Sequence, residues 1–202
     1  MGTRPIDAAL LTRLGDYHVV DGHTHFDSID LDEKMLADQA RQGAKQFCIL
    51  VIGRTAAARV VNKVAEAVWF KHRMPDRVFA FGGFDFTGMF DRGAPLPDVP
   101  LEHQLETLIA CGFDGLKLLC GKPDVRKRIG QPLDGPAFEP MLRLLEETQF
   151  PVLWHVSDPA EFWNPDAVPL WAKQHRWWYD ATHPSKAQID GEFARLLARH
   201  PR

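Results

Sequence analysis

Five short apolar runs, each followed by a longer stretch with helical periodicity, constrain the fold of this 202-residue chain most. The run at residues 46–53 is continuous and ends in Gly, which is typical of a strand buried on both faces of a parallel sheet. We expect strands at residues 18–25, 46–53, 78–85, 113–119 and 151–157. We expect helices at residues 7–14, 33–43, 55–73, 101–111, 137–148 and 185–199. The alternation of strand and helix predicts a parallel α/β fold.

Long irregular segments follow the last three of these strands, whereas the connections from each helix to the next strand are short. The irregular segments cover residues 86–100, 120–136 and 158–184 and are rich in Gly, Pro and Trp. In α/β barrels and doubly wound sheets, this asymmetry places the functional site at the carboxyl ends of the strands.

Composition narrows the class of protein. With 45% hydrophobic and 25% charged residues, residues 1–202 are expected to form a single globular domain. A net charge of −3 without a basic stripe argues against a nucleic-acid partner. Without a signal peptide or an apolar run of about 20 residues, we expect no membrane partner and a cytoplasmic location. Cys48, Cys111 and Cys120 lack a disulfide spacing, so we expect reduced thiols, with Cys48 and Cys111 buried.

Polar side chains stand at the ends of three of the expected strands. Asp21, His23 and His25 alternate along the first strand and should therefore share one face. Lys117 and His155 lie near the ends of the fourth and fifth strands, at the same edge of a parallel sheet. A shared divalent metal ion would offset the cost of burying these groups, and imidazole is a common metal ligand. The competing interpretation is a set of surface histidines, a hydrogen-bonded core histidine and a salt-bridged lysine.

Three segments make this hypothesis more specific. Residues 20–25 (VDGHTH) resemble the strand-one motif of the amidohydrolase superfamily. Residues 113–118 (FDGLKL) and 151–156 (PVLWHV) are similar to the strand-four and strand-five segments of its amidohydrolase-related, decarboxylase-like branch. Residues 158–163 and 196–201 also resemble that branch. The resemblance extends over most of the chain.

The resemblance implies a (β/α)8 TIM barrel, of which this chain would cover about strands 1–5. His23, His25 and His155 would be ligands of one or two divalent metal ions. Zinc is the first choice, while Mn, Fe and Co also suit such a site. Lys117 would either be a carboxylated lysine that bridges two metals or a residue that contacts the substrate. Asp21 would support the metal ligands or the strand end without binding the metal itself.

The resemblance also implies that parts of the family's machinery lie outside this sequence. A (β/α)8 barrel takes about 250 residues. The family's further histidine after strand six and its acid/base aspartate after strand eight have no counterpart here. We therefore expect the N-terminal part of a longer barrel, with the aspartate beyond residue 202. Open sheet edges in such a fragment would favour assembly, including a homo-oligomer.

These expectations define three functional hypotheses. The first is a metal-dependent hydrolase that attacks a C–N or C–O bond of a small organic substrate. The alternative in the same fold is a metal-dependent, non-oxidative decarboxylase of an aromatic or unsaturated carboxylic acid. The third is a catalytically inactive fragment that binds a metal or a partner. Residues 158–184 form either a substrate lid with Trp163, Trp177 and Trp178, or a loop held down by its own aromatic side chains.

Overall fold

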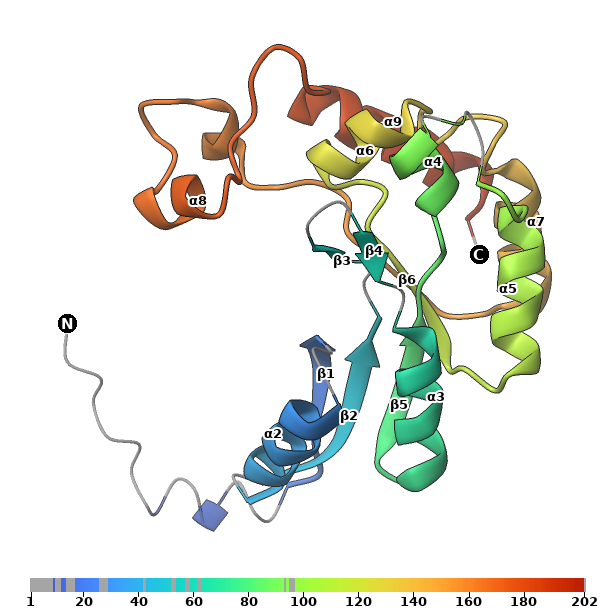
Figure 1. Cartoon of the computed structure of the whole chain (residues 1–202), viewed down its shortest axis with the longest axis vertical. Coiled ribbons are helices and arrows are strands. Elements are labelled where there is room, and N and C mark those ends of the chain that lie inside the picture. Colours follow the sequence, from blue (N-terminus) through green and yellow to red (C-terminus); the bar gives the residue numbers. More distant parts are fainter. Residues whose placement is uncertain are drawn as a thin grey trace.

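The protein folds around one curled sheet of five parallel strands, shown in Figure 1. This computed structural model describes residues 9, 12–13, 17–25, 29–41, 43–51, 54–56, 59–61, 63–92, 94 and 97–201. The strands, in their order across the sheet, are β1 (Val19–His25), β2 (Ala44–Leu50), β5 (Val78–Gly82), β6 (Gly115–Leu118) and β7 (Val152–Trp154). Each strand pairs in parallel with the next one in this order. The expected parallel α/β fold is thus confirmed.

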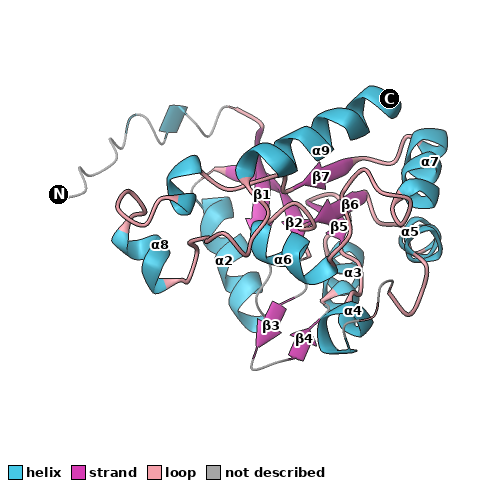
Figure 2. Cartoon of the chain, turned by 90° about the horizontal axis from the view of Figure 1, so that it is seen from above, coloured by secondary structure: helices cyan, strands magenta, loops and turns pink. Residues whose placement is uncertain are grey.

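Helices return the chain from the end of one strand to the start of the next. The longer helices are α2 (Ile29–Arg41), α3 (Val64–Arg73), α5 (Leu101–Ala110), α7 (Glu139–Thr148) and α9 (Lys186–Arg199). Figure 2, seen from above, shows the strands in an arc with α2, α3, α5 and α7 around its outer side. The sheet therefore curls like half of a barrel.

The main core lies between the sheet and the helices α5, α7 and α9. Leu105, Leu116, Leu118 and Met141 are almost completely buried there. A smaller core lies beneath α2 and α3, where Leu36 and Phe70 pack on the outward side chains of β2. Along each strand, the side chains alternate between the two faces of the sheet. The outward side chains pack into these cores, and the inward side chains lie on the concave face.

A buried ion pair ties α9 to α6 (Pro123–Ile129). The guanidinium of Arg126 donates to both carboxylate oxygens of Glu192, at 2.8 and 2.9 Å. The backbone N–H of Leu133 donates to the same carboxylate at 3.0 Å. Both ends of this pair are well satisfied, as a buried pair must be if it is not to cost stability.

Two expected loops contain helices. Residues 86–100 include α4 (Thr87–Arg92), and residues 120–136 include α6. Pro123 stands at the first turn of α6, where its missing N–H costs nothing. Gly130 ends α6 in the left-handed conformation, with φ of 68°.

The expected helix over residues 55–73 is wrong in its first half. Only α3 is helical, and an antiparallel hairpin of β3 (Arg54–Ala56) and β4 (Arg59–Val61) precedes it. The β-branched residues Thr55, Val60 and Val61 favour extended backbone, which explains the difference. The helix expected at residues 7–14 falls largely outside the described residues.

The cysteines are all free, in agreement with expectation. Cys48 and Cys120 are buried, but Cys111 is exposed, which corrects the prediction for that residue. Cys111 caps the carboxyl end of α5, where the chain turns through solvent towards β6. No helix in the described part of the chain is long and apolar enough to cross a bilayer.

Candidate metal centre

The rings of His23 and His25 meet at the carboxyl end of β1. Their Nε2 atoms are 3.0 Å apart, and the rings are nearly perpendicular, with centroids 4.7 Å apart. Two ligands of one tetrahedral zinc ion, each about 2.05 Å from the metal, lie about 3.3 Å apart. The two nitrogens are thus separated by nearly the distance that a shared metal ion requires, and their chemistry fits such an ion.

A β-bulge places this histidine pair and separates it from Asp21. Asp21 pairs with Phe47 and Thr24 with Ile49, so β1 has one residue more than β2 between these pairs. The expectation that simple alternation puts Asp21 on the histidine face is therefore corrected. Its carboxylate accepts the backbone N–H of His23 at 3.1 Å and the amide of Gln39 in α2 at 2.9 Å. Asp21 thus supports the backbone of His23 and not its ring.

Lys117 lies in β6 and is 3% exposed. Burial lowers the pKa of its amine to about 8. It makes no hydrogen bond or ion pair within the described residues. The amine, which has no partner among the described side chains, is a group that a substrate or cofactor could satisfy.

His155 follows β7 directly, and a carboxylate fixes its ring. The Nε2 atom of His155 is 3.0 Å from Oδ1 of Asp158. Oδ2 of Asp158 accepts a hydrogen bond from Nζ of Lys122 at 2.9 Å and another from the hydroxyl of Tyr179. Burial alone would raise the pKa of Asp158, but the hydrogen bonds from His155, Tyr179 and Lys122 hold it well below its usual range. Burial and the Asp158 carboxylate together raise the pKa of Tyr179.

Lys117 and His155 lie close enough to His23 to act on it electrostatically. Partial burial lowers the pKa of His23, and the charges of Lys117 and His155 lower it further, while Asp21 opposes them. Within the ranges that the structure describes, however, no three His, Cys, Asp or Glu side chains converge closely enough to hold a metal. The structure therefore brings His23 and His25 together and leaves His155 nearby, bonded to Asp158.

Residues 159–184 form a unit with a small core of their own. It contains a short 3-10 helix (Ala160–Trp163) and α8 (Leu170–Gln174), and Figure 1 shows α8 beyond the carboxyl end of β1. Buried Phe162 and Tyr179 pack in this core, with half-buried Trp163 against them. Trp177 and Trp178 are 38% and 45% exposed. The segment is thus held by its own aromatic side chains, while a lid role for Trp163, Trp177 and Trp178 stays a prediction.

Sequence reasoning missed Asp158, Lys122 and Tyr179 as parts of this site. Asp158 had a detectable signal, because it stands three residues after His155 at the same strand end. Lys122 and Tyr179 had none, because they lie 36 and 21 residues away from Asp158 in the sequence.

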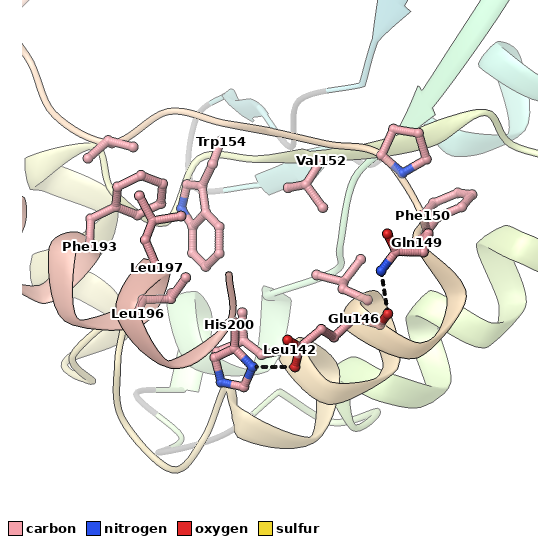
Figure 3. Close-up of a pocket in the computed structure, with 13 residues that line it drawn as sticks. Leu142, Glu146, Gln149, Phe150, Val152, Trp154, Phe193, Leu196, Leu197 and His200 are labelled. Atoms are coloured by element: carbon pink, nitrogen blue, oxygen red, sulfur yellow. Dashed lines mark hydrogen bonds and ion pairs between the residues drawn. The ribbon is translucent and has the colours of Figure 1, made fainter. Parts of the chain in front are cut away.

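An apolar groove lies elsewhere, on the outer face of β7 between α7 and α9. Figure 3 shows Val152, Trp154, Phe193 and Leu196 around this groove, whose volume is about 480 Å³. His155 does not line this groove. The groove therefore does not belong to the candidate metal centre.

No family model and no curated protein matches the chain. Among solved structures, it is similar to 2,6-dihydroxybenzoate decarboxylase from Rhizobium and to a 2,6-dihydroxybenzoate decarboxylase complexed with 2,6-dihydroxybenzoate. In both cases the identity is 15% and the TM-score is 0.48, and the match covers 91% of this chain. The chain spans 63% of the length of those proteins. A likeness this distant assigns no activity.

Proposed function

We propose that His23 and His25 hold one divalent metal ion, with zinc as the first choice and Mn, Fe or Co as alternatives. The observation that carries the proposal is the 3.0 Å separation of their Nε2 atoms at the carboxyl end of β1. Imidazole nitrogens suit all of these ions. His155 is the proposed third ligand, because it follows β7 at the carboxyl end of the same parallel sheet as the histidine pair.

We propose that the substrate of this centre is a small organic molecule with a carboxylate. Lys117 supports this, because its amine makes no hydrogen bond or ion pair to any residue that the structure describes. An anionic oxygen would satisfy the amine and favour its charged form. A bound divalent ion would add positive charge that holds and polarises substrate oxygens.

Non-oxidative decarboxylation is the reaction that these residues support best. In it the bond between the ring or chain carbon and the carboxylate breaks, its electron pair stays on that carbon, CO2 leaves, and the carbon takes up a proton from water. The protonated amine of Lys117 can orient the carboxylate, and aromatic side chains of residues 159–184 offer an apolar surface for the rest of an aromatic or unsaturated acid. In the solved proteins of similar fold, the named reaction is the decarboxylation of a dihydroxybenzoate.

Hydrolysis of a C–N or C–O bond is the second candidate, because the same histidine pair serves it. Hydrolysis needs a base that takes the proton of the attacking water. The two carboxylates beside the histidines are already engaged, Asp21 with His23 and Gln39, and Asp158 with His155, Lys122 and Tyr179. Their engagement ranks hydrolysis below decarboxylation.

Metal analysis tests the centre. We expect the purified protein to bind about one zinc ion, and His23→Ala and His155→Ala to weaken this binding strongly. His175→Ala is the matched control, because His175 is exposed and stacks only on Trp177. Zinc binding that is unchanged in His23→Ala would contradict the proposed metal site.

Turnover tests the reaction. Metal-loaded protein is offered hydroxybenzoates, including 2,6-dihydroxybenzoate, with release of CO2 as the measurement, and a parallel panel of esters and amides. Release of CO2 supports the decarboxylase, and cleavage of an ester or amide replaces it with the hydrolase. Tight metal binding without either reaction identifies a metal-binding protein that does not catalyse.

A further inference from the structure

The ring of His200 stands between two carboxylates of α7. His200 directly follows α9, and its side chain is 9% exposed. Its Nδ1 lies 3.2 Å from Oε2 of Glu146, and its Nε2 lies 3.4 Å from Oε2 of Glu139. Figure 3 shows the contact with Glu146 beside the apolar groove. One imidazole therefore joins the carboxyl end of α9 to two points on α7.

Only a doubly protonated ring satisfies both of these contacts. An ionised carboxylate accepts hydrogen bonds and donates none, so each ring nitrogen must carry a proton to bond its glutamate. A neutral imidazole carries one proton and therefore turns a lone pair towards the second carboxylate. A positive charge also suits this position, because a cation at the carboxyl end of a helix interacts favourably with its last carbonyl groups.

The other charged groups around the ring lie on the two helices that it joins. In α7, Nε of Arg143 donates to Oε1 of Glu139 at 3.1 Å. In α9, Nη1 of Arg199 lies 3.9 Å from Oε2 of Glu139. The hydrogen bond from Arg143 is the largest cause of the lowered pKa of Glu139, and His200 lowers this pKa further. Glu146 contacts no second cation within the described residues, so it depends on His200 for a charged partner.

We propose that His200 forms a pH-sensitive clasp with Glu139 and Glu146, which fastens the carboxyl end of α9 to α7 when the ring is protonated. Loss of one ring proton breaks one of the two hydrogen bonds. Imidazole changes its charge between about pH 5 and 8, so the clasp loosens as the pH rises through neutrality. The last turn of α9, which borders the apolar groove through Leu196 and Leu197, then opens more often.

Hydrogen exchange of the backbone amides in the last turn of α9 measures the clasp. The N–H of His200 donates to the carbonyl of Leu196 at 2.9 Å, and this bond breaks when the turn opens. We expect the protection factor of this turn, corrected for the intrinsic exchange rate, to fall about 3- to 10-fold between about pH 5.5 and about pH 8.5. One net hydrogen bond usually carries a factor of about this size.

Two histidine variants show whether the fall belongs to the clasp. In His200→Gln the protection factor of the last turn should stay constant over the same pH range, because glutamine does not titrate. His103→Gln is the matched control, because His103 is exposed on α5. This variant should show the same fall as the wild type.

Glu146→Gln tests the mechanism of the clasp. The amide of glutamine can accept a hydrogen bond from a ring N–H and can donate one to a bare ring nitrogen. It therefore matches the neutral ring as well as the charged ring. We expect the last turn of this variant to be better protected than that of the wild type at about pH 8.5 and to lose most of its dependence on pH.

A wild-type protection factor that is equal at both pH values overturns the proposal, and so does an equal fall in His200→Gln. Imidazole 15N chemical shifts of the wild type give a second test, which needs no variant that might fail to fold. They should show His200 protonated on both nitrogens at about pH 5.5 and on one nitrogen at about pH 8.5. A His200 ring that is already neutral at the lower pH overturns the proposal.

Discussion

Lys117 shows how one buried amine links the stability of the protein to pH. Its pKa falls from 10.5 to about 8 on folding because β6 buries it. Between these values the unfolded chain binds more protons at this lysine than the folded chain, so the free energy of unfolding rises with pH. The contribution is complete above pH 10.5 and is lost as pH falls through 8. At pH 7 the charge on this amine therefore lowers the free energy of unfolding.

We predict that Lys117→Met raises the free energy of unfolding at pH 7 and removes its rise between pH 8 and 10.5. Urea denaturation at a series of pH values measures both effects. Lys45→Met is the control, because Lys45 is exposed on β2 and its charge should contribute little. A lower free energy of unfolding for Lys117→Met at pH 7 contradicts the prediction.

At the scale of elements, the turn after β6 lies directly against the end of β7. A Cβ atom on Gly121 would collide with the carbonyl oxygen of His155 and lie 2.6 Å from that of Val156. These are backbone atoms, which cannot move aside as a flexible side chain can. The absence of a side chain at Gly121 thus allows the turn to lie this close to the backbone of His155.

We predict that Gly121→Ala lowers the free energy of unfolding by about 3 kcal/mol, the upper end of the usual cost of overpacking. Gly22→Ala, at the β1 bulge, is the control, because a Cβ there meets nothing within 4 Å. Thermal or urea unfolding of the two variants provides the comparison. Equal stabilities of the two variants would show that the turn moves freely away from β7.

The sequence predicted β2, β5 and β7 well because each contains a continuous apolar run, and buried strands must be apolar. It also placed His23, His25, Lys117 and His155 at or near the carboxyl ends of their strands, which lie on the same side of a parallel sheet. It could not predict the bulge in β1, because one extra residue leaves no mark on a seven-residue strand. For the same reason the orientation of Asp21 was wrong. The bond between Asp158 and Tyr179 depends on how an irregular segment folds back, which no local periodicity records.

At the scale of the whole molecule, the described sheet has two open edges, at β1 and β7. Val152 of β7 is 38% exposed and also borders the apolar groove beside α9. Unpaired backbone groups beside apolar side chains are a template for pairing with another chain. The geometry is thus consistent with the expected tendency to assemble.

We predict that the protein self-associates with rising concentration and that Val152→Lys reduces this association, because an edge lysine obstructs strand pairing. Sedimentation velocity over a hundred-fold range of concentration measures it. Val99→Lys is the matched control, since Val99 is 50% exposed but lies in a loop far from both edges in sequence. Equal association of both variants rules out the β7 edge as the contact.

The carboxylate of Asp158 also has a consequence for how this protein can evolve. Lys122, His155 and Tyr179 all depend on the same two oxygen atoms, so a substitution at one position changes what is tolerated at the others. Phenylalanine at 179, for example, leaves Lys122 as the one remaining donor to Oδ2 and makes later loss of that lysine more harmful. The residues at positions 122, 155, 158 and 179 should therefore change together in evolution. A relative that has replaced one of them should carry compensating replacements at the other three.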